Sequence, residues 1–322
     1  PAERFQFLLG LDAPGDSTAE RAARTTHPSF HLHAFSTRRG KLAVLRDLAA
    51  ATTAEILVFS DANTLLEPQA LRQLVRHFRD PQVGAVCGEL RLVNADGTPH
   101  GESLYWRYEV ALKFLENRMG CVLGANGAVY AVRRELFRTG RAWIVEDFQV
   151  PMEIRYAGHR VVYDPEAIAL EEAAPSLAAE FGRKVRIGAG AFQTFFSSLH
   201  FLNPLKGMLA LAYFSHKVLR WFGPFFLLAA WGASAALAAQ HPAYAAAFAA
   251  QTGFYALALA GAAFSRGGRS SRLLALPLYF SAVNLALLLG FFRLLGGRQQ
   301  THWAATPRSV AATAVAKGNA HE

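Results

Sequence analysis

Three long apolar segments in the last third of the sequence constrain the fold of this chain more than any other feature. They cover residues 222–239, 244–264 and 273–295, and no Asp or Glu occurs from residue 201 to residue 321. Each segment is close to the roughly 20 residues with which an α-helix crosses a bilayer. We therefore expect about three transmembrane helices, since the lack of acidic residues argues against the alternative of a buried helix bundle.

The net charge of +9 is carried entirely by this apolar part. Residues 1–200 contain 23 Lys and Arg against 23 Asp and Glu, whereas residues 201–322 contain 10 basic residues against one acid. This distribution argues against a nucleic-acid-binding surface, and we expect no nucleic-acid partner. Basic residues that flank apolar spans favour the cytoplasmic face of a membrane with anionic lipids.

The same basic residues indicate which side of the membrane the connections face. Lys217 and Arg220 precede the first span, and three arginines crowd the link between the second and third spans. These three are Arg266, Arg269 and Arg272. The excess of positive charge places both regions on the cytoplasmic side. Three spans would then leave the tail outside, whereas its own arginines argue the opposite, so both orientations of the tail stay open. These tail residues are Arg293, Arg298 and Arg308.

Two segments before the spans predict amphipathic helices that lie along the membrane surface. Residues 176–198 contain Arg183, Lys184 and Arg186, and residues 205–221 mix apolar with basic residues. Three glycines interrupt the first of these segments, and we expect them to distort its helix. They are Gly182, Gly188 and Gly190.

The first part of the chain alternates strand and helix patterns. Strands are predicted at residues 5–11, 30–35, 56–59 and 83–93, and helices at residues 19–24, 41–50 and 68–78. Further along, we expect a helix at residues 103–119, a strand at 121–132, a helix at 148–156 and a late strand at 161–163. Such alternation predicts an α/β fold with a doubly wound, mostly parallel sheet.

A metal-binding pattern stands at the end of one predicted strand. The apolar run 56–59 breaks at Ser60 into Asp61, Ala62 and Asn63, and ligands of open α/β sheets bind at the carboxyl ends of strands. Asp61, with Asn63 as a neutral oxygen ligand, has the hard donors that Mg²⁺ or Mn²⁺ prefers. The alternative is an Asx turn that closes a buried strand.

Other charged residues also lie at element boundaries. Asp12 ends an earlier strand, Lys41 begins a helix, and Glu146 and Asp147 open another helix, where a carboxylate is favoured by free N–H groups. For Asp147 the alternative role is a helix cap, and for Lys41 it is a solvated surface residue. Arg186 is the best partner for a phosphate, because a guanidinium pairs with it through two donors.

Read in order, these residues resemble the processive family 2 glycosyltransferases, the inverting membrane enzymes that include cellulose, chitin, hyaluronan and poly-N-acetylglucosamine synthases. The resemblance covers roughly residues 5–225. Residues 12–18 are similar to the Asp-Gly-Ser-x-Asp-Gly-Thr loop, residues 61–63 to the Asp-x-Asp motif, and residues 183–187 to Gln-x-x-Arg-Trp. The chain departs from these patterns at several positions. They are Ala13, Pro14, Ser17, Asn63, Arg183, which replaces the Gln, and Ile187, which replaces the Trp.

The resemblance implies a GT-A-type fold and a role for each candidate residue. It assigns the nucleotide sugar to Asp12, Lys41, Asp61 and Arg186, and the metal to Asp61 and Asn63. It makes Asp147 the catalytic base, with Glu146 orienting the site. The acceptor would lie beside a segment of small residues, which are Gly124, Ala125, Asn126 and Gly127. Relatives carry one more strand before the loop at Asp12, so we expect the transferase domain to lack its first strand in this chain.

The expected function is that of a metal-dependent, membrane-bound hexosyl- or N-acetylhexosaminyltransferase. It would use a UDP-sugar donor, a carbohydrate or lipid-linked acceptor and Mg²⁺ or Mn²⁺, with the catalytic domain on the cytoplasmic side of the cell membrane. Residues 1–175 would form the transferase domain, 176–221 the interface helices, and 222–322 the spans and tail. The main expectation is extension of a polysaccharide. Transfer of one sugar to a lipid and an inactive, membrane-tethered binding module are the alternatives.

Overall fold

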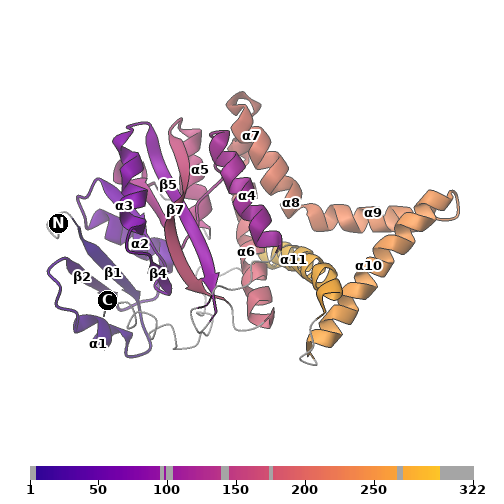
Figure 1. The fold of residues 1–322 in the computed structure, drawn as a ribbon, viewed down its shortest axis with the longest axis horizontal. Helices are drawn as coiled ribbons and strands as arrows, with labels where there is room; N and C mark the ends of the chain where they lie inside the picture. The colour runs from indigo at the N-terminus through magenta and orange to yellow at the C-terminus, as the bar shows by residue number, and fades with distance from the viewer. Residues whose placement is uncertain are drawn as a thin grey trace. The chain divides into compact units, whose positions relative to one another are not determined.

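The computed structural model describes residues 5–94, 98, 104–138, 145–173, 177–266 and 271–297. The chain forms two compact units, one within Pro1–Ala173 and one within Ala174–Gln299. In Figure 1 the first unit runs from indigo to magenta and the second continues to yellow. Among the arginines of the connection and the tail, Arg269, Arg298 and Arg308 lie outside the described residues, as do the side chains of Arg266 and Arg272.

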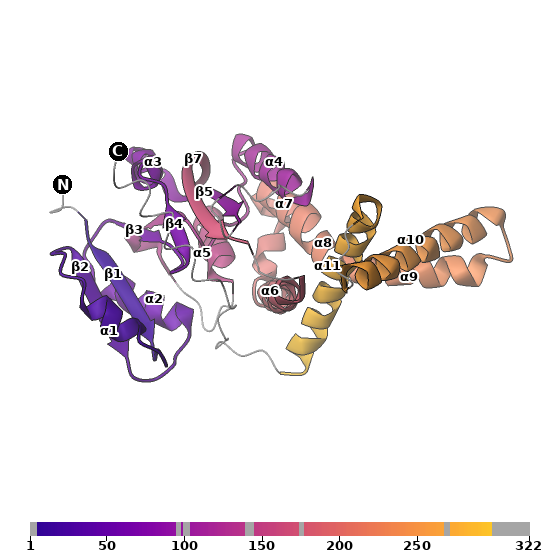
Figure 2. The same cartoon turned by 60° about the horizontal axis from the view of Figure 1, so that its bottom comes forward.

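The first unit begins with a small parallel sheet of two strands. Strand β1 (Phe7–Asp12) pairs with β2 (Phe30–Phe35), and helix α1 (Thr18–Ala23) connects them. Helix α2 (Lys41–Ala50) packs on β1 (Figure 2), where a Cβ at Gly10 would lie only 2.2 Å from Val44 Cγ1. A glycine is therefore required for this close approach, and it fixes where α2 begins relative to the end of β1.

The main sheet has five strands in the order β3-β6-β5-β7-β4. Their bounds are Ile56–Phe59 (β3), Thr64–Leu66 (β4), Val83–Val93 (β5), Tyr130–Arg133 (β6) and Arg160–Glu172 (β7). Strands β5 and β7 are parallel, whereas the pairs β3–β6, β6–β5 and β7–β4 are antiparallel. The sheet is therefore mixed, and the expectation of mostly parallel pairing was wrong. Alternation predicts where strands form, but strand direction depends on the end from which the chain re-enters the sheet.

Helices cover both faces of this sheet, as the doubly wound interpretation requires. On one face, α5 (Glu146–Tyr156) contributes Val150 and Ile154 to a core cluster that also receives residues of α2. On the other face, α3 (Ala70–Arg76) contributes Leu74 to a second cluster. Helix α4 (Leu104–Arg118) contacts β7. This layered arrangement brings the ends of β3, α2 and α5 to one region.

Two predicted strands differ from the observed ones. The segment predicted as a strand at 121–132 is extended strand only from Tyr130, because the chain turns at Gly120 (φ 64°) and Gly124 (φ 84°). Its apolar residues Cys121 and Val122 are buried without strand pairing. The late strand, predicted at 161–163, extends to Glu172, and its pairing with β5 shifts after Asp164.

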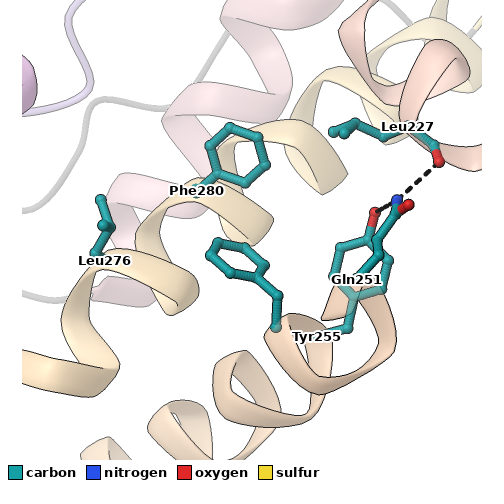
Figure 3. A pocket seen from close by; sticks show the side chains of 6 residues that line it. Leu227, Gln251, Tyr255, Leu276 and Phe280 are labelled. Atoms are coloured by element: carbon teal, nitrogen blue, oxygen red, sulfur yellow. Dashed lines mark hydrogen bonds between the residues drawn. The ribbon is translucent and has the colours of Figure 1, made fainter. Parts of the chain in front are cut away.

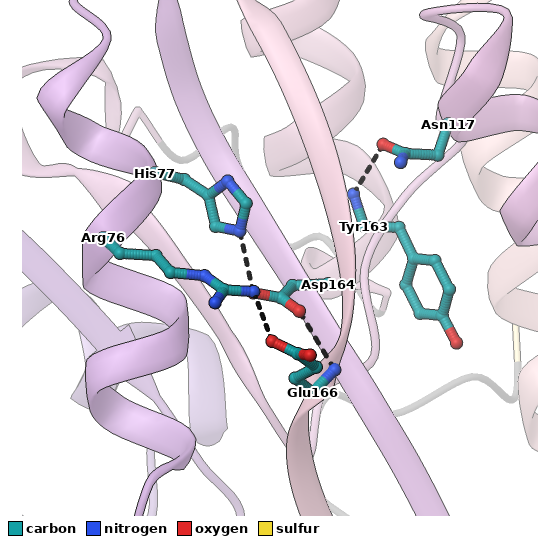
Figure 4. A network of polar contacts seen from close by, with 6 residues as sticks. All are labelled: Arg76, His77, Asn117, Tyr163, Asp164 and Glu166. Atoms are coloured by element: carbon teal, nitrogen blue, oxygen red, sulfur yellow. Dashed lines mark hydrogen bonds and ion pairs between the residues drawn. The ribbon is translucent and has the colours of Figure 1, made fainter.

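A polar network holds β7 where its pairing shifts (Figure 4). The buried carboxylate of Asp164 accepts hydrogen bonds from Arg76 at 2.9 Å and from the Glu166 N–H at 2.9 Å, and it lies 2.7 Å from His77 Nε2. Arg76 also donates to Glu166 at 2.7 Å. Because a buried carboxylate needs partners, this network stabilises the packing of α3 against the irregular part of β7.

The second unit is helical. It contains α6 (Leu177–Ser197), α7 (Met208–Ala212), the π-helical segment η6 (Tyr213–Val218), α8 (Leu219–Trp221), α9 (Gly223–Leu237), α10 (Pro242–Arg266) and α11 (Arg272–Leu295). Among the described residues, α10 and α11 are each long and apolar enough to cross a membrane. The helical stretch Met208–Trp221 and α9 qualify together, with a bend of 59° between them. The unit thus has two candidate spans, or three if the bent pair is one span.

Helix α6 is continuous despite its three glycines, so the expectation of a distorted helix was wrong. The reason is packing: a Cβ at Gly188 would lie 3.2 Å from Ala286 O, and one at Gly290 would lie 2.6 Å from Ala189 N. The backbones of α6 and α11 therefore approach directly. Small residues at such crossings are typical of helices that pack within a membrane.

A groove of about 380 Å³ lies among α9, α10 and α11 (Figure 3). It is lined by Leu227, Gln251, Phe254, Tyr255, Leu276 and Phe280. The amide of Gln251 donates to the Leu227 carbonyl at 2.9 Å and to the Tyr255 hydroxyl at 2.7 Å. Both bonds provide partners for a polar side chain in an apolar surrounding, and the bond to Leu227 ties α9 to α10.

Candidate functional site

Charged side chains from three elements meet at one end of the first unit. Lys41, the first residue of α2, places its Nζ 2.8 Å from Asp61 Oδ1 and 2.6 Å from Glu146 Oε1. Asp61 follows β3, and Glu146 begins α5. Glu146 is 4% exposed, and Asp147 lies beside it in the same turn. The structure therefore brings together Lys41, Asp61, Glu146 and Asp147, and the roles expected for them stay predictions.

Asp147 is held by the backbone of the small-residue segment. Its Oδ2 accepts a hydrogen bond from the Gly127 N–H at 2.9 Å, and its own carbonyl accepts one from the Ala125 N–H at 2.8 Å. Helix α5 has Val145 as its N-cap and no side-chain capping bond. The Asp147 carboxylate thus accepts a hydrogen bond from Gly127 and does not cap its own helix, which disfavours the helix-cap alternative.

The segment from Gly124 to Gly127 needs its glycines to reach Asp147. A Cβ at Gly124 would lie 2.7 Å from the Phe148 ring, and the residue has φ 84°. A Cβ at Gly127 would lie 3.1 Å from Asp147 Oδ2 and 3.6 Å from Lys41 Nζ. Asn126 accepts a backbone hydrogen bond from Val129. All members of the predicted acceptor segment thus lie against or next to Asp147.

The cluster perturbs its own ionisation. The pKa of Asp147 is raised to about 6, chiefly by burial and then by the charge of the neighbouring Glu146, while Lys41 acts in the opposite direction. Burial alone would lower the pKa of Lys41, but the charges of Glu146, Asp61 and Asp147 outweigh it and raise that pKa well above its usual value. A permanently charged ammonium therefore lies beside a carboxyl group that titrates near neutral pH, which is typical of functional sites.

Asp12 is connected to this cluster through the start of α2. Its two carboxylate oxygens accept hydrogen bonds from the N–H groups of Arg39 at 2.7 Å and Gly40 at 2.8 Å. Gly40 is the N-cap of α2, with φ 89°, and Lys41 follows it. Asp12 therefore fixes the loop that aims Lys41. Its neighbour Ala13 has φ 49°, a conformation that favours glycine.

Asp61 and Asn63 lie on a turn closed by the hydrogen bond from Thr64 N–H to the Asp61 carbonyl at 3.0 Å. The Asp61 side chain is 34% exposed and Asn63 is exposed. Within the described part of the chain, no group of three or more His, Cys, Asp or Glu side chains is arranged to hold a metal ion. The oxygens of Asp61 and Asn63 still fit a hard cation, provided that most of its ligands come from elsewhere.

Arg186 belongs to the second unit, on α6. Burial lowers its pKa, and the charges of Arg183 and Arg293 lower it further. Glu180 forms ion pairs with Arg183 at 3.0 Å and with Lys184 at 3.2 Å. The role of Arg186 at a diphosphate therefore stays a prediction.

Sequence reasoning missed Tyr130, which lies beneath the cluster. Its side chain is 1% exposed, and its ring stacks on Phe59 with centroids 4.8 Å apart. The Tyr130 hydroxyl has no hydrogen-bond partner among the described residues. In the sequence, the one sign of this residue is a Tyr within the apolar run that follows Gly127.

Comparisons with known proteins give the family of this chain. A family model described as "Glycosyltransferase like family 2" matches residues 12–190, which is more than half of the chain. The chain belongs to this family. Among curated family relatives, N-acetylglucosaminyltransferases from a Rhizobium species and from Bradyrhizobium diazoefficiens are 24% and 26% identical over 189 residues, or 54% of this chain. The chain spans 41% and 38% of their respective lengths.

A solved structure resembles the chain over most of its length. It is a mannosyltransferase from Pyrobaculum calidifontis in complex with GDP-Man and Mn²⁺, with a TM-score of 0.68 and 22% identity, covering 92% of this chain and 80% of that one. This likeness concerns the fold, and it confirms the GT-A-type α/β architecture expected from the sequence.

Proposed function

We propose that this chain is the catalytic and membrane part of a metal-dependent, inverting glycosyltransferase that moves a hexosyl or N-acetylhexosaminyl group from a UDP-sugar to a growing polysaccharide. The observation that carries the proposal is Asp147, a carboxylate with a raised pKa that Gly127 holds beside Lys41 and Asp61. The curated relatives are named N-acetylglucosaminyltransferases, which favours that sugar. The mannosyltransferase neighbour, solved with GDP-Man, makes GDP-mannose the second donor to test.

Asp147 would act as the general base. In a direct displacement, the acceptor hydroxyl oxygen forms a bond to the anomeric carbon, its proton passes to the Asp147 carboxylate, and the nucleoside diphosphate leaves with the electrons of the broken C–O bond. A carboxylate with a pKa of about 6 is ionised at neutral pH yet more basic than an ordinary Asp. Such matching makes general base catalysis efficient, with a typical contribution of about 10² to 10⁴ in rate.

The donor would be bound by residues at the strand ends and helix starts. Asp61 and Asn63 would hold Mg²⁺ or Mn²⁺, and the mannosyltransferase neighbour was solved with Mn²⁺. A bound metal ion would supply Lewis-acid stabilisation of the leaving diphosphate. Lys41 would add positive charge at the diphosphate, Asp12 would orient the loop before Lys41 and face the nucleotide, and Arg186 would pair with phosphate oxygens.

The acceptor would approach along Gly124, Ala125, Asn126 and Gly127, because this segment borders Asp147. Polysaccharide extension is preferred on the family resemblance. Transfer of one sugar to a lipid remains the second candidate, since Ile187 replaces the Trp of the polymerising motif and is 45% exposed. The products of the reaction distinguish the two.

The membrane part of the proposal is supported by α10, α11 and the bent pair that ends in α9. We place the protein in the cell membrane as a multi-pass protein, with the catalytic unit on the cytoplasmic side. Lys217 and Arg220, which precede α9, support this orientation through the positive-inside tendency.

The proposal is tested with the whole chain purified in detergent and supplied with Mn²⁺ or Mg²⁺. UDP-N-acetylglucosamine, UDP-glucose and GDP-mannose are offered in turn, and nucleotide release and products are followed by mass spectrometry. We expect metal-dependent release from at least one donor, and a loss of turnover with retained nucleotide binding in Asp147→Asn. Absence of release from every donor favours the inactive binding module, and equal turnover in Asp147→Asn contradicts the assignment of the base.

A further inference from the structure

Tyr130 combines deep burial with a hydroxyl that has no partner. The strand β6 places it opposite Phe59 of β3 and Cys87 of β5, in the centre of the main sheet. Its ring is fixed by stacking on Phe59, which in turn packs on Phe137 with centroids 4.9 Å apart. A buried hydroxyl without a hydrogen bond is unfavourable. We therefore expect a second state of the protein in which the Tyr130 hydroxyl donates a hydrogen bond.

The hydroxyl of Tyr130 lies within the field of the acidic cluster. Burial raises the pKa of Tyr130 well above its ordinary value, and the negative charges of Glu146, Asp147 and Asp61 raise it further. The phenol therefore stays protonated and can donate a hydrogen bond. Tyr130 belongs to the same core cluster as Val150, which lies one turn after Glu146 on α5. Glu146 is also the most buried of these three carboxylates, so its carboxylate is the acceptor that we assign to the Tyr130 hydroxyl.

Glu146 has a reason to need a second donor. Its carboxylate is 4% exposed and forms an ion pair with Lys41 at 2.6 Å. In the proposed function, Lys41 contributes its charge to the diphosphate of the donor. If the ammonium turns toward phosphate oxygens, a buried carboxylate loses its counterion, and an unpaired buried charge is strongly unfavourable.

We propose that Tyr130 is a positioning residue of the donor-bound state, whose hydroxyl donates to Glu146 when Lys41 turns from that carboxylate to the diphosphate of a bound nucleotide. This inference rests on the proposed function, because it requires that a nucleoside diphosphate binds beside Lys41. It assigns the unpartnered hydroxyl a partner that becomes available on ligand binding. The role is exerted through Glu146 and involves no contact between Tyr130 and the substrate.

Tyr130→Phe tests the proposal because it keeps the ring and its stacking on Phe59 and removes only the oxygen. The matched control is Tyr163→Phe on β7, whose hydroxyl already donates a short hydrogen bond to the buried carboxylate of Glu89. UDP is titrated in the presence of Mn²⁺ into the purified whole chain by calorimetry. Thermal unfolding is recorded with and without the nucleotide.

The two variants are expected to behave in opposite ways. Tyr130→Phe should keep or raise the thermal stability of the nucleotide-free protein, because no bond is lost, and should weaken UDP binding at least about tenfold, as expected for loss of a hydrogen bond to a charged group. Tyr163→Phe should lower thermal stability and leave UDP affinity unchanged. In a Glu146→Gln background, Tyr130→Phe should weaken binding less than about threefold, because the partner charge is gone.

The outcomes distinguish a failure of this inference from a failure of the proposed function. Equal UDP affinity in the parent and in Tyr130→Phe overturns the partner exchange and means that Lys41 stays with Glu146, while the proposed donor site stands. An undiminished effect of Tyr130→Phe in the Glu146→Gln background also overturns it. Failure of the parent chain to bind UDP or GDP overturns the proposed function itself.

Discussion

Replacing Asp147 with Asn should stabilise the folded protein while it abolishes turnover. Asn has the same shape and keeps an oxygen that can accept the Gly127 N–H, but it cannot take a proton from the acceptor. It also removes a charge that the fold holds in an unfavourable place. The free energy of unfolding is therefore the informative quantity, and its dependence on pH identifies the cause.

The sign and size of the effect follow from the pKa of Asp147, which is raised from 3.8 to about 6. A group whose pKa is raised on folding binds its proton more tightly in the folded state, so its ionisation destabilises the fold. The free-energy penalty is absent below about pH 4, grows between about pH 4 and pH 6, and is fully present above about pH 6. A shift of about 2 units corresponds to about 3 kcal/mol. This is an upper limit, since partial solvent access to Asp147 screens the charge.

Thermal unfolding of the purified chain in detergent, recorded from pH 4 to pH 8, measures this effect. Asp147→Asn should unfold at a temperature several degrees above the parent at pH 7.5, with about 2–4 °C for each kcal/mol, and the difference should vanish near pH 4. The matched control is Asp164→Asn. Asn has one acceptor oxygen in place of the two that bind Arg76 and the Glu166 N–H, and it removes the charge that pairs with Arg76, so this variant should lower the unfolding temperature. If Asp147→Asn lowers it as much as Asp164→Asn at pH 7.5, Asp147 is a structural anchor and the reasoning is wrong.

Substitutions at three further positions test the rest of the site. Asp61→Ala should abolish metal-dependent sugar transfer while the protein remains in the membrane fraction, and a parent rate that is the same with and without chelator would contradict this. Gly127→Ala should reduce turnover at least about tenfold with little change in unfolding temperature, because its Cβ would lie 3.1 Å from Asp147 Oδ2 and displace the base; an unchanged rate would show that the position of Asp147 is not critical. Ala13→Gly should change stability by less than about 0.5 kcal/mol, since relief of the strain at φ 49° offsets the flexibility of glycine, whereas Ala13→Val should cost more than about 1 kcal/mol. Chemical denaturation checks this pair, and equal stabilities of the Gly and Val variants would refute the strain.

The sequence predicted the candidate site residues where their signal lies in a few neighbouring residues. An apolar strand that breaks into Asp61, and a pair of acids at the start of a helix, are local patterns with a local physical cause. The segment from Gly124 to Gly127 was found through the family resemblance. What the structure adds is how these pieces meet: the Gly127 N–H bonds to Asp147, and Lys41 pairs with Glu146.

Other features could not be obtained from local patterns. The antiparallel insertion of β6 between β3 and β5 depends on which end of the sheet the chain re-enters, which periodicity does not encode. Tyr130 looks like an ordinary core aromatic, and its unpartnered hydroxyl is visible only in three dimensions. The glycines of α6 suggested a distorted helix, because the close approach of α11 had no signal in the sequence of α6 itself.

The close approach of Gly188 and Gly290 limits which helices can be exchanged between this protein and its relatives. With the backbones of α6 and α11 this close, a larger side chain at Gly290 would overlap main-chain atoms of the other helix. The two helices form one interlocked pair, although more than half of the second unit separates them along the chain. A chimera that exchanges the last helix with that of a relative should therefore fail to assemble unless α6 is exchanged with it. In a chimera, α6 and α11 should therefore be taken from the same protein.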